Sequence, residues 1–412
     1  MNYNSRVNIF LVSVFSIHCF FYIWQTISVL YLDINLVYAK ELFSLIGGNG
    51  LKSLYLFTFF FLFIYSTVKT FKLLTKSNLN LASILFAKQI KIFDKFLFLF
   101  LFKIILFLSI IVHVEFLLNG IIPYFDNIDK GIFRWDYAGF FQKLFFNYQS
   151  FIFILIGFFY TIKKKTSLLI FFSFIIFLFF AGNKFSALIV NSYFFLIPIS
   201  ILNDFDFEKS YPFIKKFFFI ILIILIIKIF TVFLDDSILD PFEYLINRVF
   251  IEQGQIFWIT FDNIQKYGMS DISFLLSRVF FEPIADGHSS LFYLIEKIVG
   301  LDRLLFLLEN RSQYTGAFPA ILIELFGIYP SLLVAIFLGF IYAFFLYSVY
   351  VAFLSKSIVI ILVTMFVAQP IILIAISGKF IAIFKLTYLF KFIIYASILL
   401  YSIITYNALT KK

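Results

Sequence analysis

Long apolar runs alternate with short polar segments along most of the chain. Runs of about 20 apolar residues with few charges are typical of transmembrane helices. The first run is too long for the apolar part of a signal peptide, and no small-residue cleavage site follows it, so we interpret it as a span. The pattern predicts ten spans, at 8–31, 51–69, 96–119, 148–162, 166–182, 185–202, 217–235, 330–354, 357–377 and 384–407.

Composition supports this interpretation. Of 412 residues, 63% are hydrophobic, 67 are phenylalanine and only 14% are charged. A soluble domain neither buries nor exposes so much apolar surface. The sequence therefore predicts an all-α polytopic membrane protein. Its single cysteine, Cys19, excludes a disulfide within the chain, and its three histidines lack metal-binding spacing, so we expect no metal or other cofactor.

The lysines predict an orientation. With a cytoplasmic N-terminus, every short cytoplasmic connection carries basic residues, as the positive-inside rule requires. The net charge of +10 is therefore better explained by topology than by a nucleic-acid partner. Both termini are expected in the cytoplasm. The basic residues on that side are Arg6, Lys69, Lys72, Lys76, Lys88, Lys91, Lys95, Lys163, Lys164, Lys165, Lys209, Lys215, Lys216, Lys356, Lys411 and Lys412.

Two substantial segments, 120–147 and 236–329, fall on the opposite, external side. The second divides the chain into three predicted parts. Residues 1–235 hold spans one to seven, 236–329 form a large external loop ending in a half-helix, and 330–412 hold spans eight to ten.

The arginines depart from the lysine pattern. The chain has 27 lysines and six arginines, and five of the arginines fall outside: Arg134, Arg248, Arg278, Arg303 and Arg311. Residues 236–316 hold 11 acidic and 6 basic residues, so this loop is no general basic patch. A guanidinium offers planar, bidentate contact with phosphate or carboxylate. The arginines therefore suggest recognition of anionic groups; the alternative is that each pairs with a neighbouring acid to stabilise the loop.

The stretch NRVFIEQGQIFWITFD, 247–262, places polar residues at helical spacing. Arg248, Glu252, Gln255 and Asp262 would share one face of a helix, with apolar residues on another. The polar face could turn to water and carry an Arg–Glu pair, but that order of charges is the less favourable one along a helix. We instead expect the face to line a substrate cavity.

Further candidates lie later in the loop. In ADGHSS, 285–290, a serine can cap the following helix, and His288 is the only external histidine. Imidazole is a natural general base, although a histidine beside a helix cap is often structural. Asp286 and Glu252 are the other candidate bases.

The stretch TGAFPAILIELFGIYPSLLVAIFLG, 315–339, predicts a half-helix that starts near Pro319 and ends at Gly327, before Pro330 begins the eighth span. Glu324 lies within the short piece. A carboxyl group at membrane depth indicates a cavity or a partner, or else a paired structural residue.

These features together resemble bacterial O-antigen (Wzy-type) polysaccharide polymerases, which share a C-type glycosyltransferase-like membrane fold with O-antigen ligases. The resemblance rests on about ten spans with one large late external loop, on the short turn in AGNKFSAL, on NRVFIEQGQIFW and on TGAFPAILIELFGIYPSLL. The architecture covers nearly the whole chain and the motifs about a fifth. Relatives often have arginine in the AGNK turn, where this chain has Lys184.

The resemblance implies a bacterial inner-membrane enzyme with its large loop in the periplasm. It would transfer a growing glycan from one undecaprenyl diphosphate to the non-reducing end of a repeat unit on another, without a bound metal. The essential residues of relatives are periplasmic arginines, which points first to Arg248 and then to Arg278 and Arg311. The remaining candidates for substrate binding are Arg134, Lys184, Gln255, Tyr314 and Glu324. Implied partners are lipid-linked glycans, membrane lipids and a chain-length regulator (co-polymerase).

Two alternatives remain. An O-antigen ligase has the same fold and donor but a different acceptor. A flippase or other transporter predicts repeat symmetry, charges along the spans and short external loops. The long loop at 236–329 and the lack of closely spaced acids or histidines for a proton relay weigh against transport.

Overall fold

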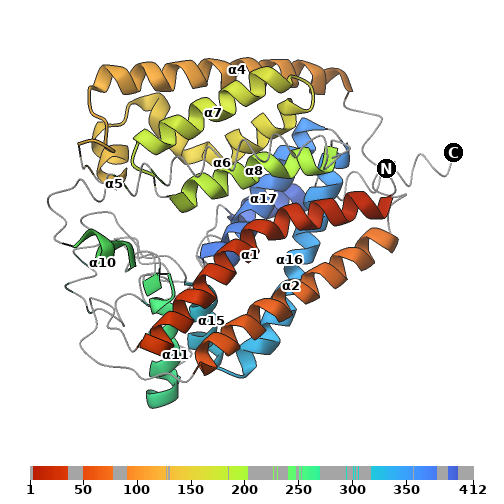
Figure 1. The fold of residues 1–412 in the computed structure, drawn as a ribbon. Coiled ribbons are helices and arrows are strands. Elements are labelled where there is room, and N and C mark those ends of the chain that lie inside the picture. Colours follow the sequence, from red (N-terminus) through yellow and green to blue (C-terminus); the bar gives the residue numbers. More distant parts are fainter. Residues whose placement is uncertain are drawn as a thin grey trace.

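The computed structural model describes residues 3–35, 50–77, 91–202, 240–246, 250–269, 317–377 and 388–397, apart from 127, 129, 184, 252 and 356, together with single positions at 226, 230, 294, 300, 302 and 305. Every regular element in these residues is a helix, and the long helices lie side by side in a bundle (Figure 1). Helix α2 packs against α1 and α16, α8 packs against α1 and α6, and α16 also packs against α17. The predicted all-α class is confirmed.

Within the described residues, six helices are long and apolar enough to cross a membrane. The protein is therefore a multi-pass membrane protein. Two more helices, α7 (Lys164–Phe180) and α8 (Phe185–Leu202), are apolar and shorter, as is a segment at Tyr388–Ser397. The predicted span at 217–235 and the end of the last one lie outside the described residues, so ten spans stays a prediction. The six are α1 (Tyr3–Asn35), α2 (Leu51–Ser77), α4 (Lys91–Asn119), α6 (Phe140–Tyr160), α16 (Pro330–Ser355) and α17 (Ile358–Ser377).

Helix α6 begins eight residues before its predicted start at 148. The cause is a cap supplied by Glu115 from α4, an acid inside a spanning helix. Its Oε1 accepts the backbone N–H of Phe141 at 3.2 Å and its Oε2 accepts that of Gln142 at 2.9 Å. A carboxylate satisfies the free N–H groups of a helix start and complements its dipole. The helix thereby gains the length that a span requires.

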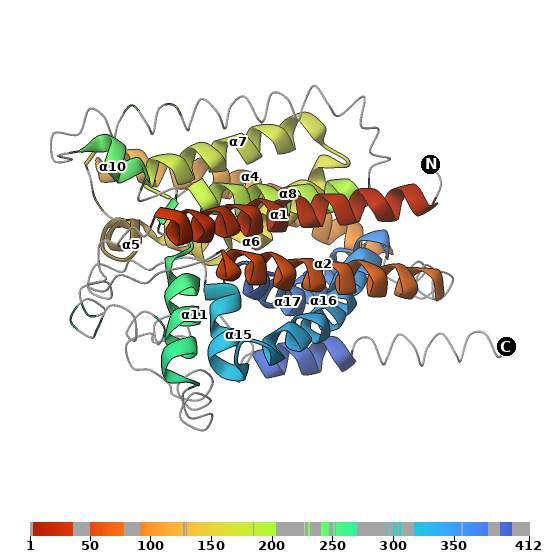
Figure 2. The ribbon, with the colours of Figure 1, turned by 60° about the horizontal axis from the view of Figure 1, so that its bottom comes forward.

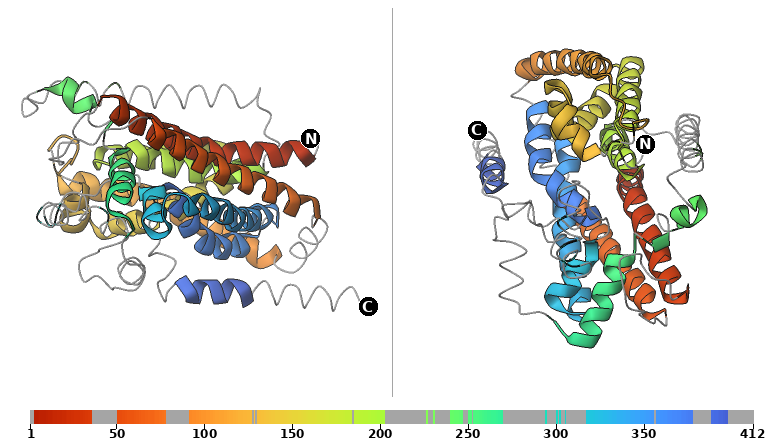
Figure 3. Two further views of the ribbon diagram at one scale, coloured as in Figure 1. Left: turned by 90° about the horizontal axis from the view of Figure 1, so that it is seen from below. Right: turned by 90° about the vertical axis from the view of Figure 1, so that its left-hand side faces the viewer.

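The bundle has two distinct ends. We call the end where α1 stops and α2, α6 and α16 begin the distal end; the N-terminus lies at the other (Figure 2). Three shorter helices lie at the distal end: α10 (Pro241–Ile246), α11 (Gln255–Tyr267) and α15 (Ala317–Phe326). Helices α11 and α15 pack against each other, and both lie crosswise to the long helices (Figures 2 and 3).

Helix α15 is the predicted half-helix. Its regular part starts at Pro319, after the extended residue Phe318, and ends where Gly327 adopts φ +83°. Pro330 then begins α16, so the three predicted breakpoints are confirmed. The eight helical residues from Pro319 to Phe326 span about 12 Å, less than half the hydrocarbon thickness of a bilayer.

Aromatic packing anchors α15 in the bundle. The ring of Phe318 is 2% exposed and lies among rings of α1 and α2. Its centroid is 5.6 to 6.3 Å from those of Tyr22, Phe59, Phe60 and Phe63. Since such ring contacts add to the gain from apolar burial, Phe318 anchors the start of the half-helix against α1 and α2 within the bundle.

Candidate functional site

The chain leading into α11 is held tightly against α1. Ser28 Oγ donates a 2.7 Å hydrogen bond to the carbonyl of Phe250, and the rings of Tyr31 and Phe250 stack with centroids 5.2 Å apart. A Cβ atom at Gly254 would lie 2.7 Å from Ser28 Oγ and 2.8 Å from the backbone nitrogen of Val29. Only glycine fits this close approach.

The close contact at Gly254 shows that the helix predicted over 247–262 is interrupted. The four polar residues do not share one continuous helix, because Gln253 and Gly254 form a turn and α11 begins only at Gln255. The predicted polar face toward a cavity is also wrong for its two described members. Gln255 is 5% exposed and Asp262 is 6% exposed, both buried within the packed protein. Close packing of α11 onto the spans turns that face inward.

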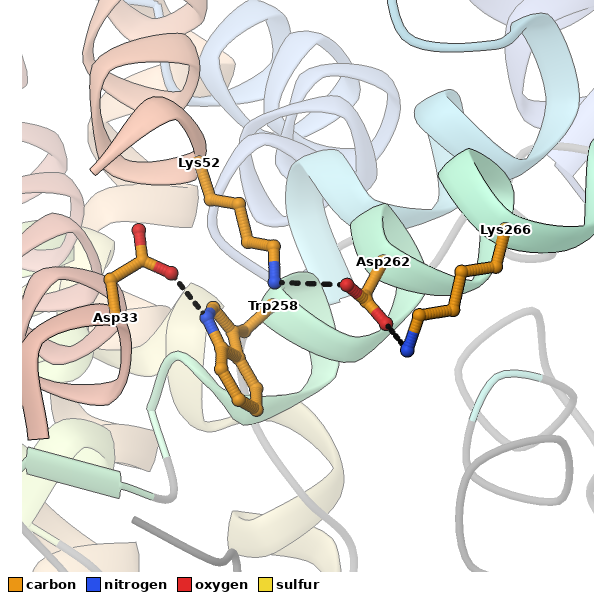
Figure 4. A network of polar contacts seen from close by, with 5 residues as sticks. All are labelled: Asp33, Lys52, Trp258, Asp262 and Lys266. Atoms are coloured by element: carbon orange, nitrogen blue, oxygen red, sulfur yellow. Dashed lines mark hydrogen bonds and ion pairs between the residues drawn. The ribbon is translucent and has the colours of Figure 1, made fainter. Parts of the chain in front are cut away.

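A network of charges ties α11 to the two spans beneath it (Figure 4). Lys52 of α2 is 3% exposed, and its Nζ lies 3.4 Å from Asp262 Oδ1 and 4.3 Å from the ring centre of Trp258. Trp258 Nε1 in turn donates a 2.6 Å hydrogen bond to Asp33 Oδ1 of α1. Lys266, on the exposed side, reaches Asp262 Oδ2 at 2.9 Å. We call these five residues the distal network.

The distal network is electrically balanced, with two carboxylates and two ammonium groups. Buried charges are tolerated when they are paired and hydrogen-bonded. The hydrogen bond and ion pair with Asp262 raise the pKa of Lys266, whose side chain is half-exposed. One atom is left over: Asp33 Oδ2 is buried and has no hydrogen-bond partner among the described residues. The network is therefore an electrically neutral contact between α1, α2 and α11, in which every residue except Lys266 is buried.

Glu324 lies on the neighbouring helix. Its side chain is fully buried, and the surrounding residues of α15 are buried and apolar. Because α15 packs against α11, α16 and α17, the structure places two predicted site residues, Gln255 and Glu324, on adjacent helices at the distal end. A carboxyl group in such surroundings indicates a function or a specific partner.

Arg134 occupies a different part of the distal end. It lies on the π-helix η1 (Phe133–Tyr137), and its Nη2 donates a 2.6 Å hydrogen bond to Asn147 Oδ1. The guanidinium also lies over the ring of Phe146, with 5.6 Å to the centroid. Burial lowers the pKa of Arg134. Its partner in the described structure is thus a neutral amide rather than the acid expected for a purely structural pair.

The other predicted site residues lie outside the described part of the chain, and their roles stay predictions. No group of three potential metal ligands occurs within the described residues. The residues concerned are Arg248, Glu252, Lys184, Arg278, Asp286, His288, Arg311 and Tyr314.

Sequence reasoning missed most of the distal network. Asp33 and Lys52 stand at the ends of predicted spans, where charges are ordinary, and Trp258 looked like one more aromatic residue. One signal was present: Asp262 and Lys266 are four residues apart with the acid first, the favourable order on a helix. The contact of Lys52 with Asp262 joins positions 210 residues apart, which a single sequence does not reveal.

One comparison with known protein families gave a match, which covers the C-terminal part of the chain from residue 285 to residue 393. Residues 285–393 match a family of unknown function, DUF6418. The match includes α15, with Glu324, and all of α16 and α17, but it covers less than half of the chain and includes none of the five residues of the distal network. Searches of curated proteins and of solved structures found no match.

Proposed function

We propose that this protein is a glycosyltransferase that polymerises undecaprenyl-diphosphate-linked repeat units at the periplasmic face of a bacterial inner membrane, for O-antigen or capsule. The growing glycan moves to the non-reducing end of a new unit, and the lipid diphosphate leaves. Its partners are the two lipid-linked glycans, the surrounding lipids and a chain-length regulator.

One observation carries this proposal. The distal network fixes α11 across the ends of α1 and α2, and in the sequence Arg248 and Glu252 lie within seven positions of the first residue of α11. Helix α15, with its buried Glu324, packs beside it. The protein thus builds a fixed polar structure at one end of its spans, where the headgroups of membrane-bound substrates are presented.

The lysines favour the periplasm for that end. Lys69, Lys72 and Lys76 lie in the last turns of α2. Lys163 precedes α7, and Lys164 and Lys165 begin it, so all six lysines are at the end opposite to the distal network. Because cytoplasmic segments are enriched in lysine and arginine, the distal end faces outward in this proposal.

The reaction assigns separate tasks to the candidate residues. A base removes the proton of the acceptor hydroxyl, whose oxygen attacks the anomeric carbon of the donor sugar as the bond to the diphosphate breaks. His288, Glu252 and Asp286 are the candidates for the base. The leaving diphosphate gains negative charge, which Arg248, Arg278 and Arg311 would stabilise.

The proposal is tested by complementing a polymerase-deficient strain and separating its surface glycans by size. The wild-type chain should produce a ladder of long glycans. Arg248→Ala should leave single capped units, while the matched control Arg6→Ala, at the predicted cytoplasmic end, should keep the ladder.

Other results would change the assignment. If loss of the protein leaves finished polymer on undecaprenyl diphosphate, the protein is a ligase; if no units reach the periplasm, it is a transporter. A normal ladder from Arg248→Ala at wild-type protein levels would remove Arg248 from the site.

A further inference from the structure

The surroundings of Arg134 have the chemistry of an anion site. Its guanidinium carries five N–H groups, and the described residues provide an acceptor for one of them, Asn147 Oδ1 at 2.6 Å. Asn147 is neutral, and the half-buried guanidinium is partly removed from water over Phe146. A guanidinium group held in this way, with further N–H groups to donate, is suited to binding an anion.

A second cation shares this surface. Lys143, Phe146 and Asn147 occupy positions i, i+3 and i+4 of α6 and therefore one face of that helix. Lys143 is half-buried and makes no ion pair within the described residues. Among the described residues, the acids that lie on α6 and η1 or cap them are Glu115, whose two oxygens accept N–H groups of α6, and Asp136 on η1 itself.

Aromatic residues place this surface at the membrane boundary. Several large aromatic side chains beside Arg134 and Lys143 are strongly exposed. Tryptophan and tyrosine are enriched at the level of the lipid headgroups, where phosphate is the most abundant anion. The exposed residues are Trp135 (60%), Tyr137 (44%) and Phe140 (71%).

We propose that Arg134 and Lys143 together bind a lipid phosphate group at the distal end of the bundle. Arg134 supplies a bidentate contact, Lys143 a point charge, and Asn147 holds the guanidinium in place. The phosphate can come from a phospholipid headgroup or from a lipid-linked diphosphate. Only the second source rests on the proposed function.

The test measures lipid binding to the purified full-length protein by native mass spectrometry. The three probes are phosphatidylglycerol, undecaprenyl diphosphate and undecaprenol, which lacks phosphate. Arg134→Met and Lys143→Met should each weaken binding of the phosphate-bearing lipids about tenfold, the loss expected for a hydrogen bond to a charged group, and leave undecaprenol unchanged. Arg134→Lys keeps the positive charge but loses the bidentate geometry of the guanidinium group. Its affinity for the phosphate-bearing lipids should fall between that of Arg134→Met and that of the wild type.

Lys69→Met is the matched control, since Lys69 also lies over an aromatic ring, Tyr65 at 5.5 Å, but at the opposite end of the bundle. It should bind all three lipids as the wild type does. Equal affinity for both phosphate lipids identifies a headgroup site, and preference for undecaprenyl diphosphate identifies a substrate site.

Unchanged binding of both phosphate lipids by Arg134→Met would overturn the proposal. If that variant fails to fold, unchanged binding by Lys143→Met, which loses only a half-buried ammonium, has the same consequence. The binding measurement uses no glycan and no polymerisation. A negative result in the glycan assay therefore does not affect the proposed phosphate site, and a negative binding result does not affect the proposed polymerase activity.

Discussion

Trp258 Nε1 donates a 2.6 Å hydrogen bond to Asp33 Oδ1, joining α11 to the last turns of α1 across 225 positions of the chain. A carboxylate near the C-terminus of a helix is opposed by the helix dipole. Asp33 therefore does not stabilise α1 locally; its contribution is to the contact between helices. The indole N–H compensates one of its oxygens, and the nearby ammonium of Lys52 adds attraction.

Replacing Trp258 by phenylalanine should loosen α11 while keeping an aromatic ring in place. The change leaves a buried carboxylate without its donor, which costs about 1–3 kcal/mol. Hydrogen–deuterium exchange in residues 255–267 should then rise by roughly 5- to 150-fold if it proceeds through local opening. Trp135→Phe is the control, because Trp135 is 60% exposed. Equal protection of α11 in both variants would contradict the assigned role of the hydrogen bond.

The pair of Lys52 and Asp262 should behave as a coupled unit. Their side chains are 4% and 8% exposed, so removing one partner leaves a buried charge, at a cost of about 3–5 kcal/mol. Lys52→Met and Asp262→Asn should each lower the thermal unfolding midpoint. The double variant should lower it by much less than the sum of the two single decreases.

The control for that cycle is Lys266→Met. Lys266 contacts the same aspartate from the exposed side, where solvent weakens the ion pair. It should shift the unfolding midpoint far less than Lys52→Met does. Additive effects of Lys52→Met and Asp262→Asn would show that the buried contact does not stabilise the fold.

Glu115 and Gly139 should also be coupled. A Cβ atom at position 139 would lie 2.6 Å from the Glu115 carboxyl carbon, so Gly139→Ala should displace the carboxylate from the start of α6. Loss of such a cap costs about 1 kcal/mol, and the clash adds to it. Differential scanning calorimetry should show a lower unfolding midpoint. In a Glu115→Ala background the same glycine substitution should have little effect; an undiminished penalty there would exclude the clash as its cause.

The raised pKa of Lys266 predicts an alkaline effect. Because the folded-state pKa exceeds the ordinary lysine value of 10.5, the stabilisation is fully present below that pH and disappears as pH rises through the folded-state value. Proteolytic cleavage after α11 should therefore accelerate more steeply above pH 10.5 in the wild type than in Lys266→Gln. Parallel profiles for the two proteins would rule out this lysine as the titrating group.

Local signals in the sequence predicted the presence of the six described spans and the limits of the half-helix. Pro319, Gly327 and Pro330 act on their own backbone, so their effects were visible in one stretch of chain. The start of α6 at Phe140 was missed because its cap comes from Glu115, on another helix.

The orientation of α11 was missed for a similar reason. Periodicity shows that Gln255 and Asp262 share a face, but Gly254, Ser28 and Lys52 decide that this face turns inward. Those contacts join distant parts of the chain. The predicted helix across 247–262 failed at Gly254, where close approach to α1 outweighs the helical pattern.

The distal network also sets an order of assembly during synthesis. Lys52 leaves the ribosome 210 residues before Asp262, and Asp33 leaves it 225 residues before Trp258. At common translation rates this delay is on the order of 10 to 40 s. Helices α1 and α2 are therefore made with an acid and a base at their distal ends whose partners on α11 come later. The arrival of α11 supplies those partners, so synthesis of the segment that holds α11 is also the step that completes the contact between α1, α2 and α11.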